Sequence, residues 1–349
     1  MAERVLTLRE LNRATLARQL LLDRKRLSPK AVIERLVGMQ AQWSPAPYVG
    51  IWTRTTSFRR ETLERELARG TIVKANLIRM TLHLVTLRDY GLMRAAISES
   101  GHADQWPDSK LVAPTVRALA EKGPTTSVEA LALIERDLGL TGLRARRAWR
   151  GGRMRAHVLH DHLSANWDAP QRHRYVALEE PEAHDPVEAR AEIVRRYLAA
   201  FGPASRQDID AWSMMRQPQI RAALERLEPL RRFRDENGRE LLDVPRAPLP
   251  DPETPAPVRF LPKWDNVLLS FADRTRVLPE KYRKKVISMG GDVKQSFLVD
   301  GLVAGIWEAE NGRVILTPFA KLSRTTQREV KEEKERLEAF LLGTRLASG

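Results

Sequence analysis

The sequence predicts an α+β protein of tandem winged-helix (helix-turn-helix with β-wing) units, followed by a β-rich C-terminal region and a terminal helix. Helical patterns that lead into a strand pair recur up to about residue 245, in the element order of a winged helix. After a linker with six prolines (245–257), strand patterns with Asp-Gly and Asn-Gly turn signals dominate. The expected units span residues 1–95, 105–180, 188–245 and 258–345.

Composition limits the classes of function. The 349 residues carry 59 Lys and Arg against 45 Asp and Glu, a net charge of +14, and no Cys. Such a surplus on a folded chain favours an anionic partner, most often nucleic acid. The lack of Cys removes thiol nucleophiles and cysteine-based metal sites. No signal-peptide pattern or apolar run of membrane-spanning length occurs, so we expect a soluble cytoplasmic protein.

The first unit begins with helical patterns. The apolar residues of Thr7–Leu22 fit an amphipathic helix, and Ser28 is placed to cap a second helix. A third helix is expected over Glu61–Ala68. The β-rich stretch Thr71–Val85 predicts a strand pair that turns near residues 74–76.

Gln40 and Gln42 are the candidate catalytic residues. Gln40 falls where the apolar stripe of the second helix should continue, so an amide stands where burial predicts an aliphatic side chain. Gly38 weakens that helix and Pro45 excludes helix soon after, so we expect the backbone to open near Gln40. In extended chain both amides would face one side, with Ala41 turned into the core. The alternative is a helix end capped by two solvated glutamines.

The second unit contains the most basic element of the chain. Thr86 and Asp89 form a capping box that starts a helix, and Thr126 with Glu129 opens another through Leu138. The segment TGLRARRAWRGGRMR follows. It is expected to form a helix that contacts DNA phosphates through Arg144, Arg146, Arg147, Arg150 and Arg153. The alternative is a solvated basic face. Residues 157–178 are expected to supply two strands.

The third unit shows its signals in order. A helix over Ile193–Phe201 stops at Gly202, and a capping box at Ser205 opens a helix over Arg206–Met215. A further helix follows Pro218. Asn237-Gly238 suits a type I′ turn between two strands.

The C-terminal region is expected to be mainly strand from Phe260 to Phe319, including FLPKWDNVLLS. Turn signals stand at Asp300-Gly301 and Asn311-Gly312. A charged amphipathic helix over Thr325–Leu342 should end the fold at Gly343.

Histidines and polar strand residues are further candidates for the site. Arg79, Thr81 and His83 alternate within RMTLHL, so they would share one face of the first hairpin and could support the active site. The alternative for His83 is a satisfied structural histidine. His160 and His162 would face one side of a strand and His157 the other, so no metal site is expected. Because Walker, dinucleotide-binding and GxSxG motifs do not occur, no nucleotide or other cofactor is expected.

Several segments together resemble the AlkZ-like winged-helix DNA glycosylases over nearly the whole chain. They are GMQAQWSPAPYVGIWTR, RMTLHLV, RRYLAAFGPASRQDIDAW, LPKWDNVLLSFADRTRVLP and FLVDGLVAGIW. Gln40-Ala41-Gln42 is similar to the family's glutamine–hydrophobic–glutamine catalytic motif, whereas a related branch has Asp at the second glutamine. The resemblance implies unhooking of crosslinked or bulky N7-alkylated guanines in duplex DNA, on a concave surface of winged helices with a hairpin from the C-terminal β region lying along the groove.

The expected function is therefore a monofunctional glycosylase that acts as a monomer on double-stranded DNA containing alkylated or crosslinked guanine. Two other classes remain open from the sequence. One is a winged-helix DNA-binding regulator or resistance protein without catalysis, and the other is a scaffold whose winged helices bind protein.

Overall fold

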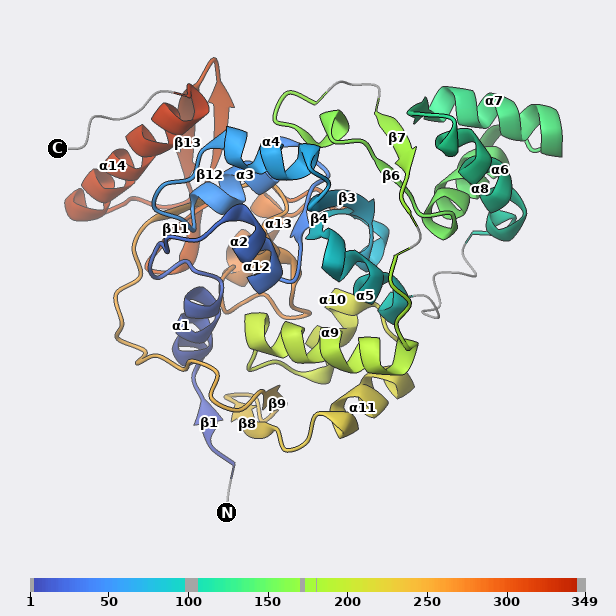
Figure 1. The fold of residues 1–349 in the computed structure, drawn as a ribbon. Coiled ribbons are helices and arrows are strands. Elements are labelled where there is room, and N and C mark those ends of the chain that lie inside the picture. The colour runs from blue at the N-terminus through green and yellow to red at the C-terminus, as the bar shows by residue number, and fades with distance from the viewer. Residues whose placement is uncertain (1–2, 98–105, 170–172, 180, 344–349) are drawn as a thin grey trace.

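The computed structural model describes residues 3–97, 106–169, 173–179 and 181–343, and it confirms the α+β class (Figure 1). The main helices are α1 (Leu8–Arg18), α2 (Pro29–Arg35), α3 (Pro45–Trp52), α4 (Arg60–Ala68), α5 (Leu87–Ile97), α6 (Ser109–Glu121), α7 (Ser127–Leu138), α8 (Gly142–Arg155), α9 (Pro186–Phe201), α10 (Arg206–Ser213), α11 (Gln217–Arg226), α12 (Asn266–Leu269), α13 (Arg283–Val286) and α14 (Arg324–Leu341).

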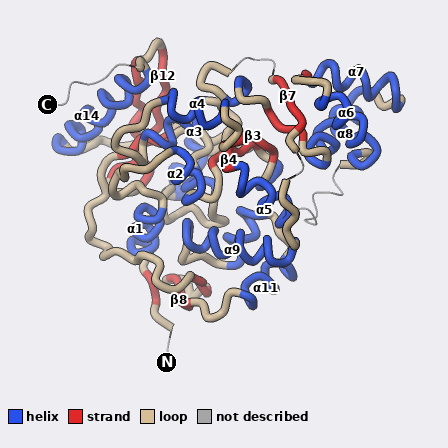
Figure 2. Tube along the Cα trace, in the orientation of Figure 1, coloured by secondary structure: helices blue, strands red, loops and turns tan. Residues whose placement is uncertain are grey.

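The strands fall into three sheets, which Figure 2 separates from the helices by colour. The strands are β1 (Val5–Leu6), β2 (Met39–Gln40), β3 (Ile72–Asn76), β4 (Leu82–Thr86), β5 (Thr125–Thr126), β6 (Val158–His160), β7 (Arg174–Ala177), β8 (Arg231–Asp235), β9 (Glu240–Asp243), β10 (Arg259–Leu261), β11 (Ser296–Val299), β12 (Leu302–Glu310) and β13 (Arg313–Pro318).

Side-chain caps set the helix starts as the sequence predicts. Thr126 and Ser205 each form the predicted capping box, in which the hydroxyl accepts from the third helical N–H and the third residue's carboxylate returns the bond. Ser28 caps α2, whose first residue is Pro29. These local hydrogen bonds do not depend on distant parts of the chain, which is why the sequence identifies them. Thr7 forms a further capping box that was not predicted from the sequence.

A six-stranded sheet joins the first two predicted units. Its strand order is β2-β4-β3-β6-β7-β5, and the β3–β6 junction pairs Lys74 with His160. The helices α6, α7 and α8 pack over one end of this sheet around their own apolar cluster (Figure 1). The sequence pattern predicted two separate units and no helix at α6. The shared sheet and the α6 helix are therefore features that the sequence did not predict. The strand β2 lies at the other edge of the sheet.

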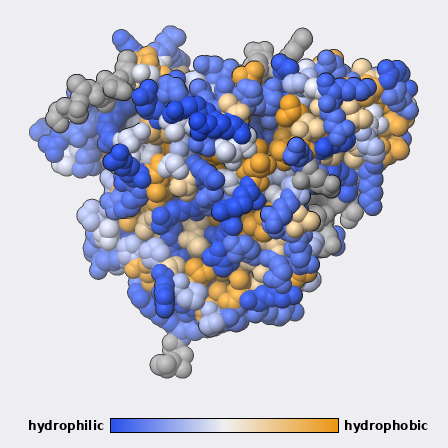
Figure 3. All heavy atoms as spheres, viewed as in Figure 1, coloured by the Kyte–Doolittle hydropathy of each residue, from blue (hydrophilic) through white to orange (hydrophobic). Residues whose placement is uncertain are grey.

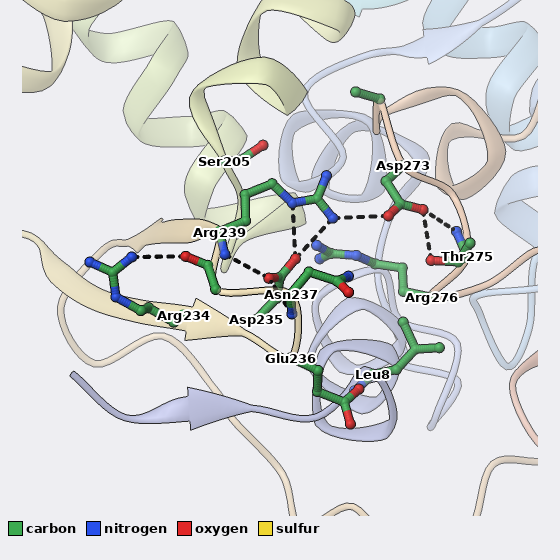
Figure 4. Close-up of polar contacts among 12 residues, drawn as sticks. Leu8, Ser205, Arg234, Asp235, Glu236, Asn237, Arg239, Asp273, Thr275 and Arg276 are labelled. Carbon is green, nitrogen blue, oxygen red and sulfur yellow. Dashed lines mark hydrogen bonds and ion pairs between the residues drawn. The ribbon is translucent and has the colours of Figure 1, made fainter. Parts of the chain in front are cut away.

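The hairpin β8–β9 forms, but its predicted type I′ turn is wrong. Arg234 pairs with Glu240, and only Gly238 of the Asn237-Gly238 pair has a positive φ. Asp235 Oδ1 instead accepts the backbone N–H groups of Asn237 and Arg239, which stabilises a longer loop. Figure 4 shows Arg239 bridging Asp235 and Asp273, so this hairpin is tied to the C-terminal region.

The C-terminal sheet, β10-β11-β12-β13, follows its turn signals. Asp300 and Gly301 have φ values of 47° and 78°, and Asn311 and Gly312 have values of 50° and 79°, so both residues of each pair are left-handed. The predicted strand FLPKWDNVLLS is wrong in its second half. There Asp265 caps the short helix α12 by accepting from the Val267 N–H.

Two buried ion pairs join the N-terminal helices to distant segments. The two Nη atoms of Arg18 donate to the Asp243 carboxylate, at 2.7 and 2.9 Å. Those of Arg54, which follows α3, reach Asp265 at 2.9 and 2.8 Å, and both side chains are almost fully buried. By contrast, the surface seen in Figure 3 is mostly hydrophilic, with smaller hydrophobic areas between. Because an unpaired buried charge is costly, the Arg18–Asp243 pair fixes the β8–β9 hairpin against α1, and the Arg54–Asp265 pair fixes the C-terminal region against the end of α3.

We predict that Asp265→Ala lowers the free energy of unfolding by about 3–5 kcal/mol, because it leaves the Arg54 guanidinium buried without its carboxylate. Urea denaturation measures the change. Asp137→Ala removes the exposed Arg136–Asp137 pair and should leave stability nearly unchanged, because solvent screens such a pair. Equal effects of the two substitutions would contradict this role of the buried pair.

Candidate active site

The segment of residues 39–41 lies extended along the edge of the six-stranded sheet, and the chain bends at Gln42. Met39 pairs with Leu84 and Gln40 with His83, and the Ala41 N–H donates to the Leu82 carbonyl at 2.7 Å. Ala41 is buried in a core cluster together with Met39. The predicted opening of the backbone near Gln40 and the inward side chain of Ala41 are thus confirmed.

Both glutamine carbonyl oxygens accept hydrogen bonds at this edge. The Gln40 Oε1 accepts from Arg79 Nη2 at 3.1 Å, and Gln40 is only 6% exposed. The Gln42 side chain is exposed, and its Oε1 accepts from the Leu82 N–H at 2.8 Å. Because only an oxygen can accept from these donors, the two amide orientations are fixed. Each oxygen keeps a second lone pair.

Arg79 reaches Gln40 from the turn between β3 and β4. The predicted turn at residues 74–76 is wrong, because β3 continues to Asn76 and residues 77–81 make the turn. Arg79 therefore does not alternate with Thr81 and His83 along a strand. Its other Nη donates to the Trp212 carbonyl at 3.1 Å, and burial with the nearby Arg274 cation lowers its pKa to about 10. The guanidinium stays charged at neutral pH.

His83 lies opposite Gln40 in a defined tautomer. Its Nδ1 is 3.0 Å from the Thr81 carbonyl, which can only accept, so Nδ1 carries the proton and Nε2 the lone pair. Burial, followed by the Arg79 cation, lowers the pKa of His83 to about 3. The ring is therefore neutral. The Thr81 hydroxyl donates to the Ile78 carbonyl within the turn, so Thr81 supports the turn and not Gln40 directly.

Asn266 is a site residue that the sequence pattern did not reveal. Its Nδ2 donates to the Leu36 carbonyl at 3.2 Å and to the Gly38 carbonyl at 2.8 Å, directly before the glutamine strand. It sits in the stretch expected to be strand, and its partners are 228 and 230 residues away in sequence. No periodic pattern signals such a contact. Asn266 nevertheless fixes where the chain leaves α2 and enters β2.

The basic helix α8 divides its arginines between solvent and interior. Arg146 and Arg147 are exposed. Arg144 forms two hydrogen bonds with Asp108, and Arg150 donates to the Met80 carbonyl at 3.2 Å. The placement of Arg153 contradicts the expectation that it contacts phosphate. It is 8% exposed, because its guanidinium turns inward to other side chains of the sheet.

The histidines of the second unit are spread over different environments. His157 lies within 3.1 Å of the Tyr90 hydroxyl, His160 is buried beside Arg153, and His162 is exposed. Within the described ranges, no group of three His, Asp or Glu side chains is arranged to hold a metal ion. Likewise, none of the described helices has the length and apolarity needed to cross a membrane.

The chain as a whole matches one class of enzyme. The family model of AlkZ-like DNA glycosylases ("DNA glycosylase AlkZ-like") matches residues 33–340, so the chain belongs to this family and the resemblance seen in the sequence is confirmed. A relative from Streptomyces sahachiroi, an interstrand DNA cross-link repair glycosylase, is 25% identical over 90% of this chain and 91% of its own.

The solved structure of the DNA glycosylase AlkZ from the same organism superposes with a TM-score of 0.81. The superposition covers 97% of this chain and 98% of that one, at 21% sequence identity. It establishes that the two chains share their fold.

The depressed pKa of His83 predicts an acid-sensitive stability. In the unfolded chain His83 has its ordinary pKa of 6.5, whereas in the folded chain its pKa is about 3. Between these two pH values only the unfolded chain binds the proton, so the free energy of unfolding should fall as the pH drops through this window. His83→Asn keeps a donor for the Thr81 carbonyl but cannot titrate. Urea unfolding between about pH 7 and 4 should therefore show a shallower slope for this variant. An unchanged slope would mean that His83 is not buried neutral.

Proposed function

We propose that the protein is a monofunctional DNA glycosylase that hydrolyses the N-glycosidic bond of bulky or crosslinked N7-alkylated guanine. The observation that carries this proposal is the pair of oriented glutamine carbonyls beside a neutral imidazole. Their hydrogen-bond partners are Arg79, the Leu82 N–H and the Thr81 carbonyl, so none of the three side chains is paired with a carboxylate. The name of the Streptomyces relative supports the crosslinked substrate.

The chemistry of N7-alkylguanine suits such a site. Alkylation at N7 makes the base cationic and a good leaving group, so no general acid is required. What remains is to hold a water against the anomeric carbon while an oxocarbenium-like sugar forms. A glutamine is not a strong base, but its carbonyl oxygen accepts from the water and its dipole favours positive charge on the sugar. After attack the water's proton passes to solvent.

Each site residue has a distinct part in this proposal. Gln40 and Gln42 accept from the water with the lone pairs that Arg79 and the Leu82 N–H leave free. Arg79 keeps the Gln40 carbonyl from turning away. His83 pairs with Gln40 across the two strands, so both side chains lie on the same face of the sheet and the Nε2 lone pair of His83 is a further acceptor for the water. The low pKa of His83 keeps it from adding a positive charge beside the sugar.

The DNA surface follows from where the exposed cations lie. We propose that the helix–hairpin units act as winged helices and that Arg146 and Arg147 of α8 contact phosphates. The segment Lys281–Lys294 supplies a second contact. Its Ile287 and Val293 form an antiparallel bridge, and Arg283, Lys284 and Lys285 are exposed. Burial, followed by the Arg283 cation, lowers the pKa of Arg274, which in turn lies close enough to Arg79 to contribute to lowering its pKa.

We predict that Gln40→Ala and Gln42→Ala each lower single-turnover excision of N7-alkylguanine by roughly 10²-fold, while the affinity for duplex DNA stays nearly unchanged. The double variant should lose less than the product of the single effects, because both amides act on one water. Gln42→Asp should keep part of the activity, since a carboxylate can serve as base.

The matched control is Gln207→Ala, an exposed glutamine on α10, which should excise at the wild-type rate. The assay heats the product in alkali to cleave abasic sites in plain and crosslinked duplexes. If both site variants excise like wild type, the glutamines only close the end of α2. The protein would then be better described as a DNA-binding regulator or resistance protein.

We predict that Arg146→Ala with Arg147→Ala weakens binding to undamaged duplex evenly across sequences. The slope of log affinity against log salt should become shallower by about 1 for each phosphate that is no longer neutralised. Fluorescence anisotropy at several salt concentrations measures this. Arg324→Ala with Arg328→Ala on the exposed face of α14 removes the same charge and should leave the slope unchanged. If the two double variants have the same slope of log affinity against log salt, Arg146 and Arg147 are exposed to solvent without contacting phosphates.

A further inference from the structure

The turn that carries Arg79 is held in an unfavourable backbone conformation. Arg79 and Met80 have φ values of 53° and 58°, in the left-handed region that side chains other than glycine rarely adopt. Residues in such regions are strained and persist only where their surroundings hold them. Within the turn, the Met80 N–H donates to the Leu77 carbonyl at 2.9 Å.

The helix α8 supplies an external hold on this turn. Arg153 Nη2 donates to Asn76 Oδ1 at 2.7 Å, and Asn76 Nδ2 donates in turn to the Met80 carbonyl at 2.9 Å. Arg150 donates to the same carbonyl at 3.2 Å. The Met80 carbonyl, which follows the two left-handed residues, is thus fixed by two side chains that depend on α8.

Arg153 is itself held by several buried neighbours. Its second Nη lies 3.2 Å from His160 Nε2, and its guanidinium carbon lies 4.6 Å from the centre of the Tyr175 ring. Burial lowers its pKa, although an arginine stays charged at neutral pH. A buried cation bound to neutral partners has little freedom to move, so the position of Asn76 is closely determined.

The other side of the turn faces the candidate catalytic residues. Arg79 bridges the Gln40 carbonyl and the Trp212 carbonyl at the end of α10. A continuous series of contacts therefore runs from Arg153 through Asn76 and the Met80 backbone to Arg79 and Gln40. It links the helix with exposed Arg146 and Arg147 to the glutamine that is proposed to hold the water.

We propose that Arg153 and Asn76 are positioning residues for base excision, which hold the residue 77–81 turn so that Arg79 keeps the Gln40 carbonyl aimed at the attacking water. This inference rests on the proposed function. It assigns Arg153 no contact with DNA, in contrast to Arg146 and Arg147 on the same helix. It also means that the α8 helix contributes to the rate of excision through the turn.

A double-mutant cycle tests the proposal. Asn76→Asp keeps an acceptor for Arg153 but replaces the donor to the Met80 carbonyl by an oxygen. It should lower single-turnover excision by about tenfold with DNA affinity unchanged, and cause less than about twofold further loss in the Gln40→Ala background. Asn311→Asp makes the same chemical change in the β12–β13 turn and should excise like wild type.

Substitutions of Arg153 give a second comparison. Arg153→Met removes the hydrogen bond to Asn76 and should slow excision, whereas Arg153→Lys keeps a donor and should recover part of the rate. If Asn76→Asp does not fold, Arg150→Ala removes the other bond to the Met80 carbonyl from an exposed side chain and enters the same cycle.

The outcomes separate this inference from the proposed function. Equal factors for Asn76→Asp in the wild-type and Gln40→Ala backgrounds, or a parallel loss of DNA affinity, would overturn the positioning role while leaving the glutamines catalytic. A Gln40→Ala variant that excises at the wild-type rate would instead overturn the proposed function. Thermal unfolding of each variant identifies loss of activity that comes from misfolding.

Discussion

The pairing of β2 with β4 is the constraint on which the candidate site depends. A strand of only two residues places Gln40 opposite His83 and turns Ala41 into the core. Because side chains alternate along a strand, a slip by one residue would exchange the faces of Gln40 and Ala41, and the glutamine would no longer face Arg79 and His83. The register is held from both ends, by Asn266 on the Gly38 carbonyl and by the bond from Ala41 to the Leu82 carbonyl.

Next to this strand Arg79 is charged, whereas His83 is neutral. Arg79 remains charged and directs its two donors at carbonyl oxygens, whereas His83 is held neutral by burial and by Arg79 itself. A cation near a developing oxocarbenium is unfavourable in isolation. In the proposed complex the DNA phosphates offset the repulsion between Arg79 and the oxocarbenium. Arg79 in turn holds the Gln40 side-chain carbonyl in one orientation.

Local signals were predicted well and long-range contacts were not. The capping boxes at Thr126 and Ser205 and the turn at Asn311-Gly312 depend on neighbours within a few residues, so the sequence alone identifies them. The turn at 77–81 was misplaced because its left-handed residues are stabilised by Asn76 and α8 and contain no glycine. The six-stranded sheet and Asn266 depend on pairings far apart in sequence, which no periodicity encodes.

The glutamines are proposed to stabilise the transition state more than the ground state. The most direct test is the affinity for duplex DNA that carries a cationic pyrrolidine abasic analogue, which mimics the oxocarbenium sugar, compared with a neutral tetrahydrofuran abasic site. We predict that the wild-type protein binds the cationic analogue at least about 10²-fold more tightly, and that Gln40→Ala removes most of this preference without changing affinity for the neutral site. Equal affinities of the wild-type protein for both analogues would contradict this role of the glutamines.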